Sequence, residues 1–337
     1  MATANGNSET YSLQDVLAAK DPDGKLATVA EIITKSNPIM QDVMWQEGLL
    51  EEGDRITVRK TLGTPQWKRY NEYASASTAK VTQVDEVCGH VEDWSQIDAD
   101  LAKKAGDLNG YLMRESKAKI AAMGQAVVET MLYGNLSSDP ATFQGFLPRL
   151  GGLNEEYMNG TPVVIDAGGR TASANASILL VGWGTDTVHG IYPKYSKAGL
   201  DFQNKGLVTS EKDGKFLDVY RSKFSWEAGL AVRDYRYIVR IANIDVASLA
   251  TIGGSDDASA QLYLKFIDAI SAIPNPDAVK LCAYGPRKVW SALSKKAALT
   301  GNRDAGQSIT KVGMVSDIMG VPFRRLDSML TAEAVIA

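Results

Sequence analysis

Two cysteines and two histidines are the residues best suited to metal binding or nucleophilic catalysis. Cys88 and His90 are two positions apart, whereas His189 and Cys282 lie far from them in the sequence. Structural zinc needs four ligands at recognisable spacing, and a catalytic thiol needs an activating partner. Cys88 follows a valine-containing predicted strand, where an inert thiol is common. We therefore favour packed or hydrogen-bonded roles for all four residues and predict neither a metal site nor a catalytic thiol.

Other motifs that carry chemistry are weak. The sequence contains no GxSxG, HExxH or GxxxxGK[ST] motif. The glycine turns Asp166–Gly169 and Ile252–Asp256 lack the strand and helix that flank a dinucleotide-binding loop, so we predict flexible loops. Three acidic pairs and one basic helix face are best interpreted as solvated charges. The alternative for the acidic pairs is the carboxylate pair of a glycosidase, and the alternative for the basic face is contact with phosphates. The acidic pairs are Glu51-Glu52, Asp85-Glu86 and Asp256-Asp257, and the basic face comprises Arg287-Lys288 and Lys295-Lys296.

The aromatic residues Trp67, Tyr70 and Tyr73 form a different kind of group. They lie in a polar segment that cannot bury them locally, interleaved with Lys68 and Arg69. Large aromatic residues together with arginine are enriched at protein interfaces. We predict that this group contacts a partner, with folding back onto the chain and ligand binding as the alternatives.

The elements around these aromatic residues predict a thin two-stranded arm. Residues 55–63 and 80–87 alternate polar and apolar side chains, but neither segment is strongly hydrophobic on one face. The intervening stretch of about fifteen residues exceeds an ordinary hairpin loop. An arm with so little core of its own needs something else to pack against.

A long helix is predicted from Asp98 to Tyr133. Apolar residues recur there at mostly three- and four-residue steps, and Ser95 to Asp98 has capping-box-like spacing. The helix would be about 54 Å long, although Gly106 and Gly110 can bend or break its first part. We expect its core-facing residues to be Leu112, Ile120, Met123, Val127 and Met131.

The second half reads as mixed α/β. We expect strands at 177–183, 216–224, 230–232, 235–241, 279–284 and 321–326, and helices at 258–273 and 286–298. Pro322 favours an edge position for the last strand.

Composition excludes several classes of function. The chain has 337 residues, 36 basic and 40 acidic residues, and a net charge of −4, which does not suit a protein that grips phosphates. No apolar run is long enough for a membrane helix, and the polar N-terminus does not resemble a signal peptide. Two cysteines cannot form a disulfide framework, so a reducing cytoplasm suits the chain.

Read in order, these features resemble the Hong Kong 97 capsid fold of tailed-bacteriophage major capsid proteins. Short strings along residues 10–243 carry the resemblance, and the remainder matches by organisation only. They are Asp21–Lys25, Trp45–Gly48, Tyr133–Asn135, Gly145–Arg149, Asp166–Gly169, Trp183-Gly184, His189–Lys194, Lys197–Leu200 and Asp234–Tyr237. Their order is the specific signal. The Lys–Asn crosslink of the fold's namesake and the large N-terminal scaffolding segment of some members find no match.

The resemblance implies an α+β fold with five parts: an N-terminal arm at 1–50, the E-loop at 51–95 and a peripheral domain with the spine helix at 96–160. A mainly axial domain with some peripheral strands follows at 161–305, and the chain returns at 306–337. In this arrangement Trp67, Lys68, Arg69, Tyr70 and Tyr73 lie on the E-loop.

The implied function is a major capsid protein without enzymatic activity or cofactors. Its partners would be copies of itself in hexamers and pentamers, with weak proximity to enclosed double-stranded DNA and no membrane. Scaffolding, portal and decoration proteins are further possible partners. The protein would be made in the cytoplasm of a host bacterium and reside in the virion. The alternatives are an encapsulin-like compartment, an α/β enzyme of unknown class, and a phage tail or decoration protein.

Overall fold

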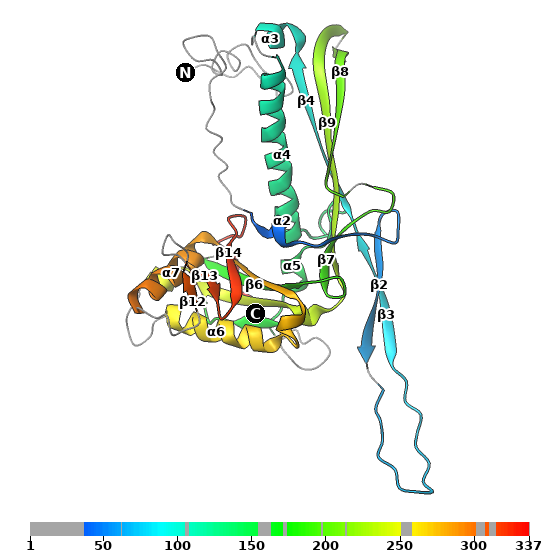
Figure 1. Ribbon diagram of the computed structural model, residues 1–337, viewed down its shortest axis with the longest axis vertical. Coiled ribbons are helices and arrows are strands. Elements are labelled where there is room, and N and C mark those ends of the chain that lie inside the picture. The colour runs from blue at the N-terminus through cyan, green and yellow to red at the C-terminus, as the bar shows by residue number, and fades with distance from the viewer. Residues whose placement is uncertain are drawn as a thin grey trace. The chain divides into compact units, whose positions relative to one another are not determined.

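The computed structural model describes residues 37–61, 63–104, 108–153, 163–170, 174–196, 198–212, 214–250, 258–300, 307–309 and 315–336. Most of the expected N-terminal arm, residues 1–36, lies outside them. The described residues cluster into two compact units, each built from segments that are far apart in the sequence (Figure 1). The expected division into an arm, an E-loop, a peripheral domain, an axial domain and a return segment stays a prediction.

The first unit comprises residues 90–127 and 199–227. Its elements are β4 (Gly89–Asp98), α3 (Ala99–Lys104), the first part of α4 (Leu108–Tyr133), β8 (Leu200–Lys212) and the first part of β9 (Lys215–Val232). Strand β9 pairs with both β8 and β4. An ion pair of 3.0 Å between Lys119 and Asp93 joins α4 to β4.

The second unit comprises residues 35–89, 128–198 and 228–337. Its strands are β1 (Trp45–Glu47), β2 (Gly53–Thr61), β3 (Lys80–Val87), β5 (Val164–Asp166), β6 (Asn175–Trp183), β7 (Val188–Tyr192), β10 (Ile238–Asp245), β11 (Lys280–Gly285), β12 (Gln307–Ile309), β13 (Val315–Ile318) and β14 (Val321–Arg325). Its helices are α2 (Ile39–Asp42), α5 (Phe146–Arg149), α6 (Ala258–Ala272) and α7 (Arg287–Thr300), with 3-10 turns at Tyr235–Tyr237, Ser248–Ala250 and Pro276–Ala278.

Strand β6 is central to the sheet of the second unit. It pairs with β10 and β11 in antiparallel fashion and with β7 in parallel fashion. All nine of its residues are buried, which explains its nearly continuous apolar sequence. Helix α6 packs on β10, and α7 packs on β13 and β14. The core between them contains Phe266 and Phe323, whose rings meet edge to face at 6.1 Å.

Buried ionic networks tie both ends of the described chain to this sheet. Asp42 at the end of α2 forms ion pairs with Lys280 and Arg324 and accepts a hydrogen bond from Tyr284. Near the other end, Glu333 pairs with Arg240 at 2.9 Å and accepts hydrogen bonds from Ser177 and Tyr133. The segments around Asp42 and Glu333 are therefore held to the sheet by ion pairs and hydrogen bonds.

Three details differ from the sequence prediction. In place of one helix at 98–133, the structure has two described helices, α3 and α4. Residues 105–107, which connect them, are not among the described residues. Asp98 rather than Ser95 caps α3, because its carboxylate accepts the Asp100 N–H at 2.8 Å. Strand β14 lies between β13 and β11 and not at an edge. Pro322 is tolerated near the strand's start because pairing with β11 begins at Phe323.

Candidate assembly interface

The five aromatic and basic residues selected from the sequence lie in the loop that joins β2 and β3. We call residues 63–79 the tip loop. Trp67, Tyr70 and Tyr73 are fully exposed there, and Lys68 and Arg69 are exposed beside them. The three aromatic side chains therefore do not fold back onto their own chain, which was one of the alternatives. The rings are available to a partner and cover no core of their own.

The tip loop contains a turn held by local hydrogen bonds. Glu72 N–H donates to the Arg69 carbonyl at 3.2 Å, and Arg69 N–H donates to the Glu72 carboxylate at 3.1 Å. Asn71 has φ of +66°, a left-handed conformation that asparagine tolerates better than most residues. These bonds give the exposed side chains a defined backbone support.

The root of the arm is pinned by a buried ion pair. Arg149, at the end of α5, forms a two-pronged contact with Glu86 of β3 at 2.6 and 2.7 Å. The Arg149 guanidinium also donates to Tyr235 Oη at 3.1 Å. Burial would lower the pKa of Arg149, but the hydrogen bond and charge of Glu86 outweigh it and raise that pKa. Because such a bidentate geometry fixes both position and orientation, it holds the end of β3 in place at the root of the arm.

Strand β2 has its own buried contact at the same root. The Asp54 carboxylate accepts from Leu49 N–H at 3.2 Å and lies 3.5 Å from the Arg233 guanidinium. A side chain on Gly53 would place its Cβ 1.9 Å from the Glu86 carbonyl, so only glycine fits there. The arm is thus fixed at its root, where β2 begins and β3 ends.

Sequence reasoning did not find the Glu86 anchor. It grouped Asp85 and Glu86 as solvated charges, which is correct for Asp85 and wrong for Glu86, which is 5% exposed. Adjacent residues of a strand point to opposite faces. That alternation could have shown that only one of the pair can be solvated on a packed strand, but not which one.

The residues expected in the core of the spine helix differ in their burial. Met123, Val127 and Met131 are buried, and Leu112 is partly buried. Ile120 is 40% exposed, so its assignment to the core is wrong. Partly buried residues 112, 116 and 119 lead to Met123 along one face, and Ile120 lies about 100° around the helix from residue 119.

The cysteine and histidine candidates occupy unrelated environments. Cys282 is buried in β11, where burial raises the pKa of its thiol, and Cys88 is partly buried. His189 is buried in β7, whereas His90 is exposed and contacts Glu92 and Glu227. Within the described part of the chain, no three His, Cys, Asp or Glu side chains are grouped as metal ligands would be. None of the helices searched there is long and apolar enough to cross a membrane.

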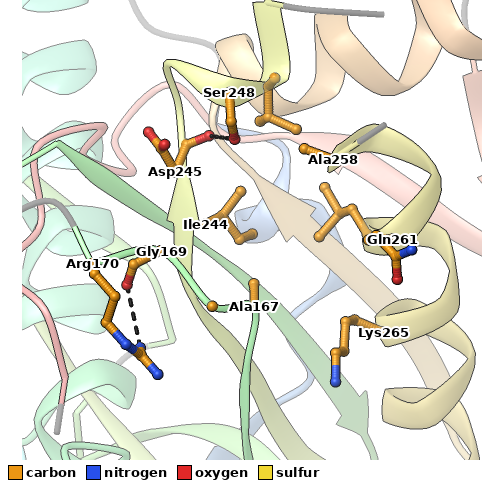
Figure 2. Close-up of a pocket in the computed structure, with 12 residues that line it drawn as sticks. Ala167, Gly169, Arg170, Ile244, Asp245, Ser248, Ala258, Gln261 and Lys265 are labelled. Atoms are coloured by element: carbon orange, nitrogen blue, oxygen red, sulfur yellow. Dashed lines mark hydrogen bonds between the residues drawn. The ribbon is translucent and has the colours of Figure 1, made fainter. Parts of the chain in front are cut away.

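One cavity of about 420 Å³ lies in the second unit, beside the glycine turn at Asp166–Gly169 (Figure 2). Its apolar wall includes Ile244, and its polar rim includes Arg170 and Lys265. The Arg170 guanidinium is bound by Asp166 at 2.7 Å, so its charge is already compensated. The lining offers no histidine or cysteine that could act as base or nucleophile.

Comparison with known proteins identifies the family of this chain. Residues 21–337 match the family described as major capsid protein GP7. The chain belongs to that family. Its role is therefore that of a structural shell protein of a phage head and not that of an enzyme. No curated protein sequence matches the chain significantly.

Solved capsid structures agree with the family in fold. The chain is similar to a chain in the cryo-EM structure of bacteriophage Epsilon15, with a TM-score of 0.73 and 23% identity over 99% of this chain and 100% of that one. It is also similar to the bacteriophage JBD30 capsid, with a TM-score of 0.52 and 10% identity over 89% and 93%. The chain thus has the expected α+β capsid fold. As a member of the major capsid protein family, it self-associates into a shell.

Proposed function

We propose that this capsid protein forms hexamers and pentamers that close an icosahedral head around double-stranded DNA, with the tip loop strapping neighbouring copies together. The observation that carries the proposal is the contrast within the β2–β3 arm. Its root is held by the buried Arg149–Glu86 ion pair, whereas its tip exposes Trp67, Tyr70 and Tyr73 completely. Large exposed rings on an anchored support favour docking onto another protein.

The charge of the chain supports a container for DNA. Acidic residues outnumber basic ones, 40 to 36. In the helix considered for phosphate contacts, Arg287, Lys288 and Lys295 are exposed, as the solvated interpretation expected. A shell that holds DNA at high density without gripping it needs only such a balanced surface. Scaffolding, portal and decoration proteins are proposed as further partners, and synthesis in the cytoplasm of a host bacterium fits a chain with only two cysteines.

Electron microscopy of the purified protein tests the strap. Wild-type protein should form shells or ring-shaped capsomers. Deleting residues 64–77 should leave a soluble, folded subunit that no longer assembles, because the deletion removes the exposed rings and leaves the anchored root. Normal shells from the deleted chain would rule out the strap.

The contents of particles from infected cells separate the phage head from the encapsulin-like alternative. We expect double-stranded DNA inside, sensitive to nuclease only after the shell is opened. Particles filled with a cargo protein and lacking nucleic acid would instead support the compartment.

A further inference from the structure

The cavity beside the glycine turn at Asp166–Gly169 is formed by three elements of the second unit (Figure 2). They are the turn that follows β5, the end of β10 with the 3-10 turn at Ser248–Ala250, and the N-terminal half of α6. The volume of about 420 Å³ lies within the range of about 300–1,000 Å³ that small-molecule sites occupy. The cavity is therefore large enough for a compact organic molecule.

The floor of the cavity is apolar. It consists of Ile244, Leu249 and Leu262, which are 3%, 4% and 3% exposed. All three belong to the core cluster that packs α6 on the sheet, so their positions are set by contacts that do not depend on a ligand. An apolar group placed on this floor would be withdrawn from water, which is favourable.

Helix α6 brings polar groups to the same cavity. Its lining residues are three and four positions apart and therefore share one face of the helix. They are Ala258, Gln261, Leu262 and Lys265. Lys265 is partly buried and forms no ion pair within the described residues. Ala258 is the first residue of α6, so the positive end of the helix dipole lies at the cavity as well. Both features favour an anion beside this wall.

The turn opposite α6 is braced by its own hydrogen bonds. The Asp166 carboxylate accepts from the Gly168 N–H at 2.9 Å and from the Asn243 amide at 3.0 Å. It also accepts from the Arg170 guanidinium at 2.7 Å. Burial acts to raise the pKa of Asp166, but these hydrogen bonds outweigh it and lower that pKa to about 2. The carboxylate therefore stays ionised near neutral pH and holds Arg170 at the rim.

The charged groups are distributed unevenly around the opening. Figure 2 shows Arg170 and Lys265 on the two sides of Ala167. Asp245, which also lines the cavity, lies at the other end, and its carboxylate accepts the Ala247 N–H at 2.9 Å. At the end near Ala167, Lys265 supplies the uncompensated charge, and Arg170 supplies N–H donors that its bonds to Asp166 leave over. An anionic head group is therefore favoured between Arg170 and Lys265.

We propose that this cavity binds a small amphipathic anion, whose apolar body lies on Ile244, Leu249 and Leu262 and whose head group lies between Arg170 and Lys265. The ligand class is an alkyl or aryl carboxylate, sulfonate or phosphate monoester. A molecule bound there contacts both the turn after β5 and α6, and it stabilises the folded second unit by mass action. The site is separate from the tip loop and goes beyond shell assembly.

Octanoate, with octanol as its uncharged analogue, tests the site in the full chain. In unassembled subunits labelled at isoleucine and leucine methyl groups, octanoate should shift the NMR signals of Ile244 and Leu262. Leu264 is the internal control, because it is 55% exposed on another face of α6 and does not line the cavity. Octanoate should also raise the thermal midpoint, since a ligand that binds only the folded chain stabilises it.

Two comparisons test the charge of the ligand. Octanol should bind at least about fivefold more weakly than octanoate, because the charge-assisted contacts are lost. Lys265→Glu should weaken octanoate binding by a similar factor and leave octanol binding unchanged, whereas Lys265→Arg should bind octanoate like the wild type. Lys288→Glu is the matched control, because it makes the same charge change at an exposed lysine of α7 outside the cavity.

The proposal is overturned by any of three results. One is the absence of shifts at Ile244 and Leu262 with octanoate at about 10 mM, a concentration that detects even a millimolar Kd. Another is octanol binding as tightly as octanoate, which would indicate an apolar surface without selection for an anion. The third is equal weakening by Lys265→Glu and Lys288→Glu, which would indicate a general effect of charge. Shell assembly is read separately by electron microscopy, so these results leave the proposed function intact.

Discussion

Asp85 and Glu86 are neighbours in the sequence, but their ion pairs differ in solvent exposure and therefore in their expected contribution to stability. Arg55 and Asp85 are about half exposed, with atoms 2.6 Å apart, whereas Arg149 and Glu86 are 5% and 6% exposed at the same distance. Exposed pairs contribute little because water already solvates both partners. Removing one partner of a buried pair leaves an uncompensated charge.

We therefore predict opposite outcomes for two neighbouring substitutions. Glu86→Ala should lower the free energy of unfolding by about 3–5 kcal/mol, because Arg149 remains buried without its carboxylate. Asp85→Ala, the control on the other face of the same strand, should have a much smaller effect. Thermal unfolding of unassembled subunits measures both, and equal losses would contradict the anchor.

His189 gives the fold a sensitivity to acid. Its imidazole is buried in β7. Burial lowers its pKa to about 4, and the charge of Arg233 adds to this, while Asp54 and Asp186 act in the opposite direction. The unfolded chain binds a proton near pH 6.5, so the folded state loses stability as the pH falls from about 6.5 towards 4.

His189→Leu should reduce this loss. Between pH 7.5 and pH 4 the wild type should lose about 2–3 kcal/mol more stability than the variant, since other titrating groups are common to both. Urea unfolding at several pH values measures the difference. Parallel pH profiles for the two proteins would show that His189 gains its proton without cost in the folded chain.

At the scale of elements, α4 does not keep one buried face along its length. Met123 is 3% exposed and Ile120 is 40% exposed, although both belong to the apolar stripe seen in the sequence. Met123→Asp should place a charge in the core and destabilise the subunit by about 3 kcal/mol or more. Ile120→Asp is the matched control and should change the thermal midpoint only slightly. A similar drop for both variants would show that the outer face of the helix is also packed.

Elements with a clear apolar pattern were predictable from the sequence. The strand expected at 177–183, the helix at 258–273 and the two strands of the arm all correspond to elements of the structure. Each has a run or period that reflects burial within its own neighbourhood.

Strands β4 and β8 were not predicted, for a physical reason. Most residues of β8 are exposed on both faces, so the usual alternation of apolar and polar residues is absent. Both strands pair with β9. For β4 this partner is distant in the sequence, so no local pattern indicates the pairing. The same limit applies to the Glu86–Arg149 anchor, whose members are separated by 63 positions.

At the scale of the whole molecule, weak contacts become decisive because a shell repeats them in every copy. A subunit that exposes Trp67, Tyr70 and Tyr73 gains little from them while it is alone. Closed symmetric assembly buries each contact many times, so a modest change per contact shifts the assembly threshold steeply.

Trp67→Ala tests this amplification directly. The ring is fully exposed in its own chain, so its removal should leave the thermal midpoint of the isolated subunit unchanged. Truncating a large aromatic anchor at an interface commonly costs about 2 kcal/mol, which weakens each contact about 30-fold. The protein concentration at which shells appear by light scattering should therefore rise at least tenfold. Trp67→Phe, which keeps an aromatic ring, should restore part of the loss. An unchanged threshold for Trp67→Ala would exclude Trp67 as the anchor and transfer the docking role to Tyr70 or Tyr73.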